Sequence, residues 1–363
     1  THFIQPHAVP VLADLGLAHL HVPAWSVPTK AVFVTPGGLV EGPGPYLPGQ
    51  QDLDALNLDR RVLDPALRAA ARQQGVRYLD ATTVERVEED RAGWMVEARD
   101  ETGLRRIRAA LVVAADGRRS RLAEALGNPT GTHPNDRAAL FGYFSGIKTR
   151  ADDRSVFIMN ERDLACVYPL IDGRTQLVLF AEKSRVEGWG GADGRLRPFL
   201  DYFAGLAEAP SVADAVPESA LLGYHDYPNQ LRQPVVGSIP FVGDAAMSLD
   251  PMSGVGCGFA MVSGDLLARS FANRSLARDD IADGLAEYRQ RFEDVLLPHA
   301  EGICRDALVD KDEATQRRTF ETICGNPQLS QQYLALPGRM LLPGAFKREL
   351  LRALMTRGRT PKK

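Results

Sequence analysis

The chain has 363 residues, of which 44% are hydrophobic and 25% charged, and its 46 acidic and 43 basic side chains give a formal net charge of −3. A nucleic-acid-binding protein needs a clear excess of Lys and Arg to neutralise phosphates, and an acidic disordered protein has far fewer apolar residues. The composition excludes both classes. Because single cores rarely grow beyond about 250–300 residues, the length predicts two domains, or one large domain with an insertion.

Neither a membrane span nor a signal segment is indicated. No run approaches the roughly 20 apolar residues that cross a bilayer, and no basic-then-apolar stretch opens the chain, which begins with Thr instead of Met. The four cysteines form no C-x-x-C pair, so neither a disulfide framework nor a metal site is expected. These features predict a cytoplasmic protein without a nucleic-acid partner, and they leave the oligomeric state open.

In the first third, helical spacing predicts helices over residues 6–17 and 59–75, the second beginning near Asp64 and Pro65. Short strands are expected at residues 76–79, 82–87, 94–99 and 106–108. Residues 110–115 are small and β-branched throughout, which is typical of a strand buried on both faces of a parallel sheet.

The middle of the chain has a different pattern. Four strand-like runs separated by turn residues between 138 and 183 indicate an inserted antiparallel sheet. Beyond it we expect a helix over 196–206, strands over 221–227 and 238–242, and helices from about Phe259 to the end.

The first chemical motif is LVVAADGRRSR, at residues 111–121. Asp116 stands at the carboxyl end of the expected strand, where α/β folds bind ligands, and Gly117 lets the backbone come close to one. An ordinary strand-turn-helix with a solvated Asp explains this motif equally well.

The second motif is SIPFVGDAAMSLDPMSGVGCG, at residues 238–258. Glycines before a helix leave its first amides open to a ligand, and the helix dipole favours negative charge there. The carboxylate of Asp244 can accept hydrogen bonds from sugar-chain hydroxyls. The motif therefore predicts a nucleotide-like cofactor with polyol and anionic parts, the alternative being a glycine-rich loop without a ligand.

Together these segments resemble the FAD-dependent monooxygenases with the para-hydroxybenzoate hydroxylase fold, which are similar to flavin halogenases and geranylgeranyl reductases. A motif of the form A-D-G-x-x-S-x-x-R is matched at residues 115–120, with its Arg arriving early at Arg121. A motif G-D-A-A-H-x-x-x-P-x-x-G-x-G is matched in register at residues 243–256. The departures are Met247, where His is usual, and Gly258, where Asn or Ser is usual.

The resemblance implies an α/β fold with three parts. The FAD-binding Rossmann-like domain, on a parallel sheet, is expected to comprise residues 1–30, 51–130 and 231–275. The substrate domain, with the inserted antiparallel sheet, takes residues 31–50 and 131–230, and a C-terminal helical region takes 276–363. The family's opening G-x-G-x-x-G unit is absent from this sequence, so we expect about 40 residues ahead of Thr1.

The resemblance also implies which residues contact FAD: Arg60, Asp116, Gly117, Gly243, Asp244, Pro251, Gly254, Val255 and Gly256. Arg60 belongs to a segment similar to the family's D-R-x-x-F-D, although a surface arginine is the plain alternative. No metal ligand is implied. His2 and His225 are weak catalytic candidates, and a structural role explains each of them at least as well.

The implied activity is insertion of one oxygen atom from O2 into an aromatic or other electron-rich small molecule through a flavin hydroperoxide. NAD(P)H, as a transient reductant, or a partner flavin reductase would supply the electrons. Aromatic residues of the inserted sheet could line the substrate pocket, although such residues are more often core: Phe141, Tyr143, Phe157, Tyr168 and Phe180.

Three alternatives remain. A flavin halogenase is disfavoured because no W-x-W-x-I-P motif is found; Trp25, Trp94 and Trp189 are isolated. A reductase of the geranylgeranyl reductase type shares the same FAD motifs. From another class, the protein could be a flavoprotein-like scaffold that binds its ligand without turnover.

Overall fold

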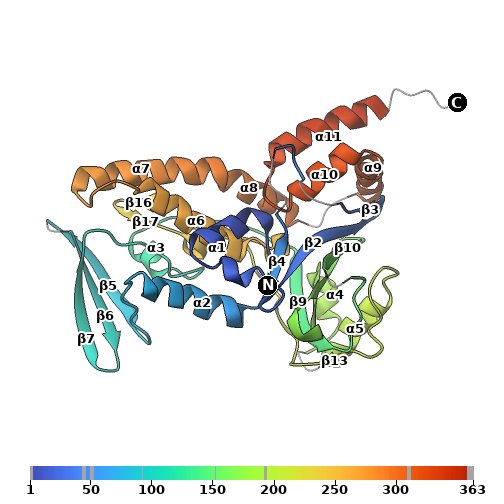
Figure 1. Cartoon of the computed structure of the whole chain (residues 1–363), viewed down its shortest axis with the longest axis horizontal. Coiled ribbons are helices and arrows are strands. Elements are labelled where there is room, and N and C mark those ends of the chain that lie inside the picture. Colours follow the sequence, from blue (N-terminus) through green and yellow to red (C-terminus); the bar gives the residue numbers. More distant parts are fainter. Residues whose placement is uncertain are drawn as a thin grey trace.

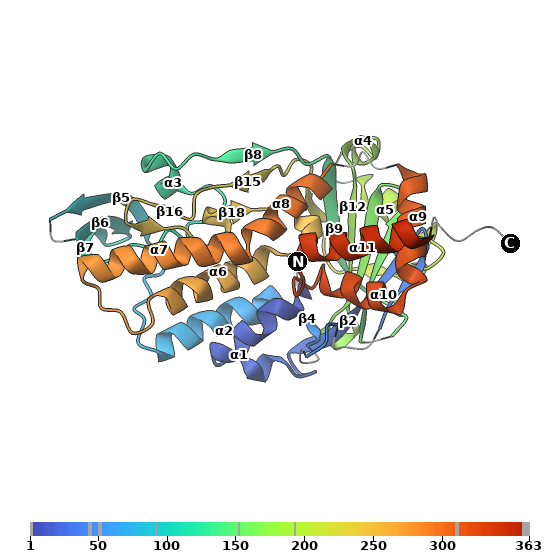
Figure 2. The ribbon, with the colours of Figure 1, turned by 90° about the horizontal axis from the view of Figure 1, so that it is seen from above.

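The computed structural model describes residues 3–42, 46–49, 53–91, 93–151, 153–191, 194–308 and 312–357. The molecule is elongated, with a large sheet towards one end and a helical body towards the other (Figures 1 and 2). The helices α9–α11 lie over the sheet, and the three-stranded sheet β5–β7 lies at the opposite end. The fold is α/β with additional antiparallel sheets and C-terminal helices, so the expected fold class is confirmed.

The large sheet has ten strands and carries the inserted antiparallel part expected at residues 138–183. Its strands follow the order β1 (Phe3–Ile4), β4 (Ala55–Leu58), β2 (Ser26–Thr35), β10 (Arg154–Asn160), β11 (Asp163–Pro169), β12 (Thr175–Glu182), β9 (Arg137–Ser145) and β13 (Val216–Pro217), while β3 (Gly38–Val40) pairs with β2 and β14 (Leu222–Tyr224) with β9. β2 pairs in parallel with β10, and the other pairings are antiparallel.

Alternate residues of these strands point to opposite faces, so the sheet builds two cores. On one face Phe157 packs with Phe33 beneath α9 (Glu313–Cys324), α10 (Pro327–Ala335) and α11 (Pro343–Arg357). On the other face Val156 and Ile158 pack beside α4 (Lys183–Glu187) and α5 (Leu196–Ala204). The face beneath α9–α11 is the one that forms a cavity.

A third core lies in the helical body, between α1 (Val9–Asp14), α2 (Arg60–Gln73), α6 (Gly256–Ser270), α7 (Arg278–Val295) and α8 (Leu297–Asp306). α7 buries Leu285, Tyr288 and Phe292 in this core, next to Phe241. The helices beyond residue 276 are therefore divided between two cores: α7 and most of α8 belong to the helical body, whereas α9–α11 cover the sheet.

The expected strand over residues 110–115 is reduced to one bridge. Ala114 pairs in parallel with Phe241, through Ala114 N to Pro240 O at 2.8 Å and Val242 N to Ala114 O at 3.0 Å. Burial on both faces was expected, but Val113 is 40% exposed. Among the described residues, this segment also has a strand neighbour on one edge only.

Three small sheets complete the described part: β5 (Thr83–Asp90), β6 (Gly93–Asp100) and β7 (Gly103–Ala109); β16 (Val235–Val236) and β17 (Ile239–Pro240); and β18 (Met247–Ser248), β15 (Asn229–Leu231) and β8 (Gly131–His133). A short helix, α3 (Arg121–Ala125), follows the first motif. No helix in the described ranges is both long and apolar enough to cross a membrane.

Several element boundaries differ from expectation, three of them as follows. α2 begins at Arg60, because Asp59 caps it by accepting from Arg61 N at 2.8 Å, and Pro65 lies inside the helix. Residues 76–79 form no strand; Val76 is 53% exposed, and the segment has no sheet to join. α6 begins at Gly256, three residues before the expected start.

We expect Tyr288→Phe to lower the free energy of unfolding by about 1–3 kcal/mol. The fully buried Tyr288 hydroxyl donates to the carbonyl of Phe241 at 2.7 Å, and its removal leaves a buried acceptor without that donor. Urea denaturation measures the change. Tyr78→Phe is the matched control, because the Tyr78 side chain is 44% exposed. Equal stability of the two variants would contradict this role of Tyr288.

Candidate functional site

The two sequence motifs lie side by side. The Ala114–Phe241 bridge joins their strands, so Asp116 and Asp244, each a few residues further on, follow adjacent strand ends. Arg232 links the same two segments by hydrogen bonds, because its guanidinium donates to Arg118 O at 2.8 Å and to Ala245 O at 3.1 Å. The two motifs therefore meet at the place where the sequence predicts a crevice for the cofactor.

The two aspartates differ in their surroundings. Asp116 is exposed and accepts from Leu122 N at 3.1 Å, at the start of α3. Asp244 is half-buried; burial raises the pKa of its carboxyl group, while the positive charges of Arg118 and Arg60 lower it. No described residue hydrogen-bonds to the Asp244 carboxylate. This carboxylate is an acceptor available to a ligand, whereas Asp116 already has a local role.

The turn before α6 leaves room for a ligand. Asp250 Oδ1 accepts from Met252 N at 3.0 Å, and Gly254 takes the left-handed conformation, with φ +65°, that favours glycine. The first amides of α6 have no partner within the helix. A Cβ placed on Gly256 would meet no atom within 4 Å. Open space and free donors thus coincide at the positive end of a 15-residue helix.

Arg60 reaches the same place from another helix. Its Nη1 donates to the sulfur of Cys257 at 3.3 Å, and its Nε donates to Asp64 at 2.6 Å. The first turns of α2 and α6 are therefore in contact. The structure brings together Arg60, Asp244 and Gly256, three residues that the sequence proposed for one site.

The two departures from the family motif have packing explanations. A Cβ on Gly258 would lie 3.0 Å from Cε1 of His7 and 3.4 Å from Cβ of Ala8, so a larger residue would displace the N-terminal segment. Met247 is buried in the core of the helical body. His7 itself is enclosed, and burial lowers its pKa to about 3. Tight packing of the first residues against α6 therefore accounts for Gly258.

The site's donors and acceptors fit FAD. A ribityl chain needs acceptors such as the Asp244 carboxylate, and the pyrimidine edge of a flavin needs donors such as the free amides of α6. The open space at Gly256 lies between an arginine and this helix start. No described feature of the crevice excludes the cofactor.

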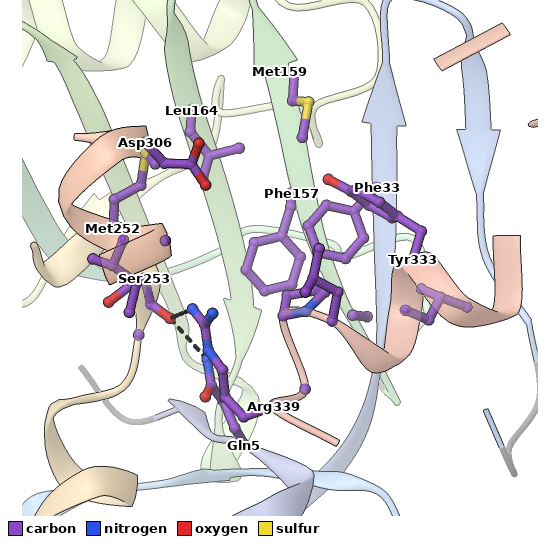
Figure 3. Close-up of a pocket in the computed structure, with 18 of the residues that line it drawn as sticks. Gln5, Phe33, Phe157, Met159, Leu164, Met252, Ser253, Asp306, Tyr333 and Arg339 are labelled. Carbon is purple, nitrogen blue, oxygen red and sulfur yellow. Dashed lines mark hydrogen bonds between the residues drawn. The ribbon is translucent and has the colours of Figure 1, made fainter. Parts of the chain in front are cut away.

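A cavity of about 550 Å³ lies between the sheet and the C-terminal helices (Figure 3). Phe33 and Phe157 stack with ring centroids 4.7 Å apart, and Phe3 meets Phe157 edge-on at 5.5 Å. The residues from Met252 to Gly254, directly before α6, form part of the wall. The cavity therefore reaches from an aromatic wall to the turn of the cofactor crevice.

Of the five aromatic residues suggested for a pocket, Phe157 and Tyr168 line this cavity. The other three are not among its described lining residues: Phe141, Tyr143 and Phe180. His225 lies elsewhere and pairs with Glu187 at 3.0 Å, and His2 lies outside the described residues.

The sequence reasoning did not find the rest of the wall. Gln5, Phe33, Tyr333 and Arg339 come from four separate segments, and no motif connects them. The sequence could have suggested Met252, because it lies inside the second motif, one residue after Pro251.

Comparison with known proteins agrees with the crevice. Residues 52–192 match the family described as FAD binding domain. The chain is a relative of the FAD-dependent monooxygenases. It is 31% identical over 126 residues to a salicylate hydroxylase of Pseudomonas putida, covering 35% of this chain and 25% of that protein. The resemblance inferred from the two motifs is confirmed.

A reductase relative matches a longer stretch. The chain is 28% identical over 247 residues to digeranylgeranylglycerophospholipid reductase 2 of Methanopyrus kandleri, covering 66% of this chain and 61% of the reductase. The match thus spans less than two thirds of either curated relative.

Two solved structures share the fold. The p-nitrophenol 4-monooxygenase PnpA of Pseudomonas putida superposes with a TM-score of 0.73 at 17% identity, over 94% of this chain and 89% of that one. The flavin-dependent brominase Bmp2 gives 0.75 at 16% identity, over 98% and 89%. These likenesses establish the architecture.

We expect Gly256→Ala to weaken FAD binding by about tenfold or more, or 1.4 kcal/mol, because the methyl group enters the open space at the start of α6. Stability should be unchanged or slightly higher, since Ala favours a helix over Gly by about 1 kcal/mol. FAD fluorescence titration and denaturation measure the two quantities. Gly264→Ala, on the same helix with equal space around its Cβ, is the control. Unchanged FAD affinity in Gly256→Ala would remove the cofactor from this position.

Asp244→Ala should also lose at least about tenfold in FAD affinity, since a hydrogen bond to a charged group contributes about 1.5–3 kcal/mol. The same titration measures the loss. The control, Asp265→Ala, removes a carboxylate that pairs with Arg269 within α6. Normal affinity in the Asp244 variant would contradict the assignment.

Proposed function

We propose that the chain is an FAD-dependent monooxygenase that hydroxylates an aromatic or other electron-rich small molecule. The observation that carries the proposal is the position of the 550 Å³ cavity. Its aromatic walls suit a flat apolar ligand, and it ends at the turn that begins the proposed cofactor site. Its size is within the range of small-molecule pockets.

The proposed FAD ligands divide into three groups. Asp244 would accept hydrogen bonds from the polyol chain, and the amides of Val255 and Gly256 would donate to the anionic edge of the ring. Arg60, Asp116 and Gly117, with Gly243, Pro251 and Gly254, shape the remainder of the crevice. When bound, FAD supplies the oxygen chemistry by reducing O2.

The chain's own contribution is positioning and exclusion of water. The stacked pair Phe33 and Phe157 offers a flat surface for an aromatic ring, and Met252 and Gly254 form the wall nearest the cofactor. An apolar enclosure limits the loss of activated oxygen to water. No acid-base residue is assigned, because the cofactor carries the difficult chemistry.

The proposal includes a source of electrons and a location. NAD(P)H acting transiently, or a partner flavin reductase, would reduce the flavin, and the proposed location is the cytoplasm.

A second candidate is reduction of an isoprenoid double bond. It is favoured by the 247-residue match to a digeranylgeranylglycerophospholipid reductase. The aromatic wall and limited volume of the cavity favour a compact aromatic ligand instead.

Oxygen isotope labelling tests the function. We expect the FAD-loaded chain, given NAD(P)H and a panel of phenols and aryl acids, to consume NAD(P)H and O2 and to place one ¹⁸O atom from ¹⁸O2 in the product. Phe157→Ala should raise KM for the same substrate several-fold, because one half of the stacked aromatic wall is lost.

Other results would identify a different activity. Alkene saturation without O2 uptake would establish the reductase, and bromide-dependent halogenation would establish a halogenase. Flavin binding without any turnover would establish a binding scaffold.

A further inference from the structure

An arginine of the cavity wall lacks the partners that an enclosed cation needs. Arg339 follows α10 and lines the cavity, and its Nη2 donates to Ser253 O at 3.0 Å. Its Nε is buried without a hydrogen-bond partner. A guanidinium has five N–H donors, so most of them are unused among the described residues. An enclosed charge with so few partners is costly to the folded protein.

No group among the described residues forms an ion pair with the guanidinium of Arg339. Burial, together with the charge of Arg339, lowers the pKa of His7 to about 3 and that of His299 to about 4, so both rings are neutral at pH 7. Burial has the larger effect on Arg339 itself and lowers its pKa to about 10, whereas the charge of Asp306, which also lines the cavity, favours the protonated form.

The other acidic groups of the wall are engaged elsewhere. Asp250 forms a buried pair with Arg137 at 3.4 Å, and Asp312 caps α9 by accepting from Thr315 N at 2.8 Å. Arg339 is therefore a cation of the cavity wall that has one hydrogen bond and no ion pair among the described residues.

The side-chain amide of Gln5, a neutral hydrogen-bond donor, lies beside the guanidinium of Arg339. Gln5 Nε2 donates to the same Ser253 carbonyl at 2.8 Å, and Figure 3 shows Gln5 and Arg339 reaching that oxygen together. The aromatic pair of Phe33 and Phe157 faces the cavity from the sheet. One end of the space is cationic and the adjacent wall is flat and apolar.

Backbone geometry fixes this arginine in place. Arg339 has φ +59°, in the left-handed region that non-glycine residues seldom adopt. The preceding Gly338 accepts from His7 N, which ties this loop to the N-terminal segment. The loop therefore holds Arg339 at the cavity despite the cost of its conformation.

We propose that Arg339 binds an anionic substituent, such as a carboxylate, of an aromatic substrate whose ring lies against Phe33 and Phe157. The proposal rests on the proposed function, because it specifies the substrate class for that site. A carboxylate would supply the charge-assisted hydrogen bonds that Arg339 lacks and would place the far edge of the ring away from the cationic end.

Binding of matched acids and amides tests this proposal. With the FAD-loaded chain, isothermal titration at fixed ionic strength should show salicylate binding at least about tenfold tighter than salicylamide, and benzoate likewise tighter than benzamide. Arg339→Gln should reduce each ratio to less than about twofold, and Arg339→Lys should keep part of it. The control Arg348→Gln, an exposed site on α11, should leave the ratios unchanged.

A stability measurement separates binding from a structural role. Because Arg339→Gln removes an enclosed, poorly partnered charge, the ligand-free variant should melt at the same temperature as the original chain or higher. A marked fall in melting temperature together with an unchanged acid-to-amide ratio would assign Arg339 to folding and overturn the proposal.

Three further outcomes are decisive. Equal binding of acids and amides by the original chain overturns the proposal. Inorganic phosphate that displaces salicylate at equal concentration would make this a general anion site. A shift of the flavin potential in Arg339→Gln, without a change in the acid preference, would assign Arg339 to the flavin.

The two proposals can fail separately. Oxygen-dependent hydroxylation of neutral phenols without any acid preference would retain the monooxygenase and reject the anion site. Selective acid binding without O2 uptake would retain the anion site and reject the monooxygenase.

Discussion

The pair of backbone hydrogen bonds between Ala114 and the 240–242 segment is the constraint on which the candidate cofactor site depends. It places the ends of two segments, more than 120 residues apart in the chain, at one edge. Arg232 reinforces it by donating to carbonyls on both sides. Without this junction, Asp116 and Asp244 would belong to separate loops, and α6 would have no crevice before its first turn.

The same junction connects the crevice to the cavity. The chain passes from Gly243 and Asp244 through β18 to the turn at residues 250–255, so one continuous segment contributes to both spaces. The N-terminal residues contact the same turn and the helix that follows it. Gln5 hydrogen-bonds to Ser253, and His7 packs against Gly258. A ligand bound in the cavity would therefore lie next to a cofactor bound at the start of α6, because one turn separates the two places.

Charge is distributed unevenly over these two spaces. In the crevice, Arg60 and Arg118 face the half-buried Asp244, so charges of both signs are present. In the cavity, Asp250 is paired with Arg137, whereas Arg339 has one hydrogen bond and no ion pair among the described residues. Burying a charge without compensation lowers stability, and such groups concentrate at sites that bind ligands.

The sequence by itself determined the parts of this protein that are local. Glycines at fixed spacing before a helix, apolar runs that end in Asp, and alternating strands were sufficient to predict the α/β class and the inserted sheet. The relation to FAD-dependent monooxygenases came from the resemblance of the two motifs to that family. Only the tertiary structure decided what depends on distant contacts. The exposed Val113, the need for Gly258 beside His7, and the cavity wall formed by Gln5, Phe33 and Arg339 come from segments that no spacing rule relates. Periodicity reports which face of an element is buried, but it carries no information about which other element covers that face.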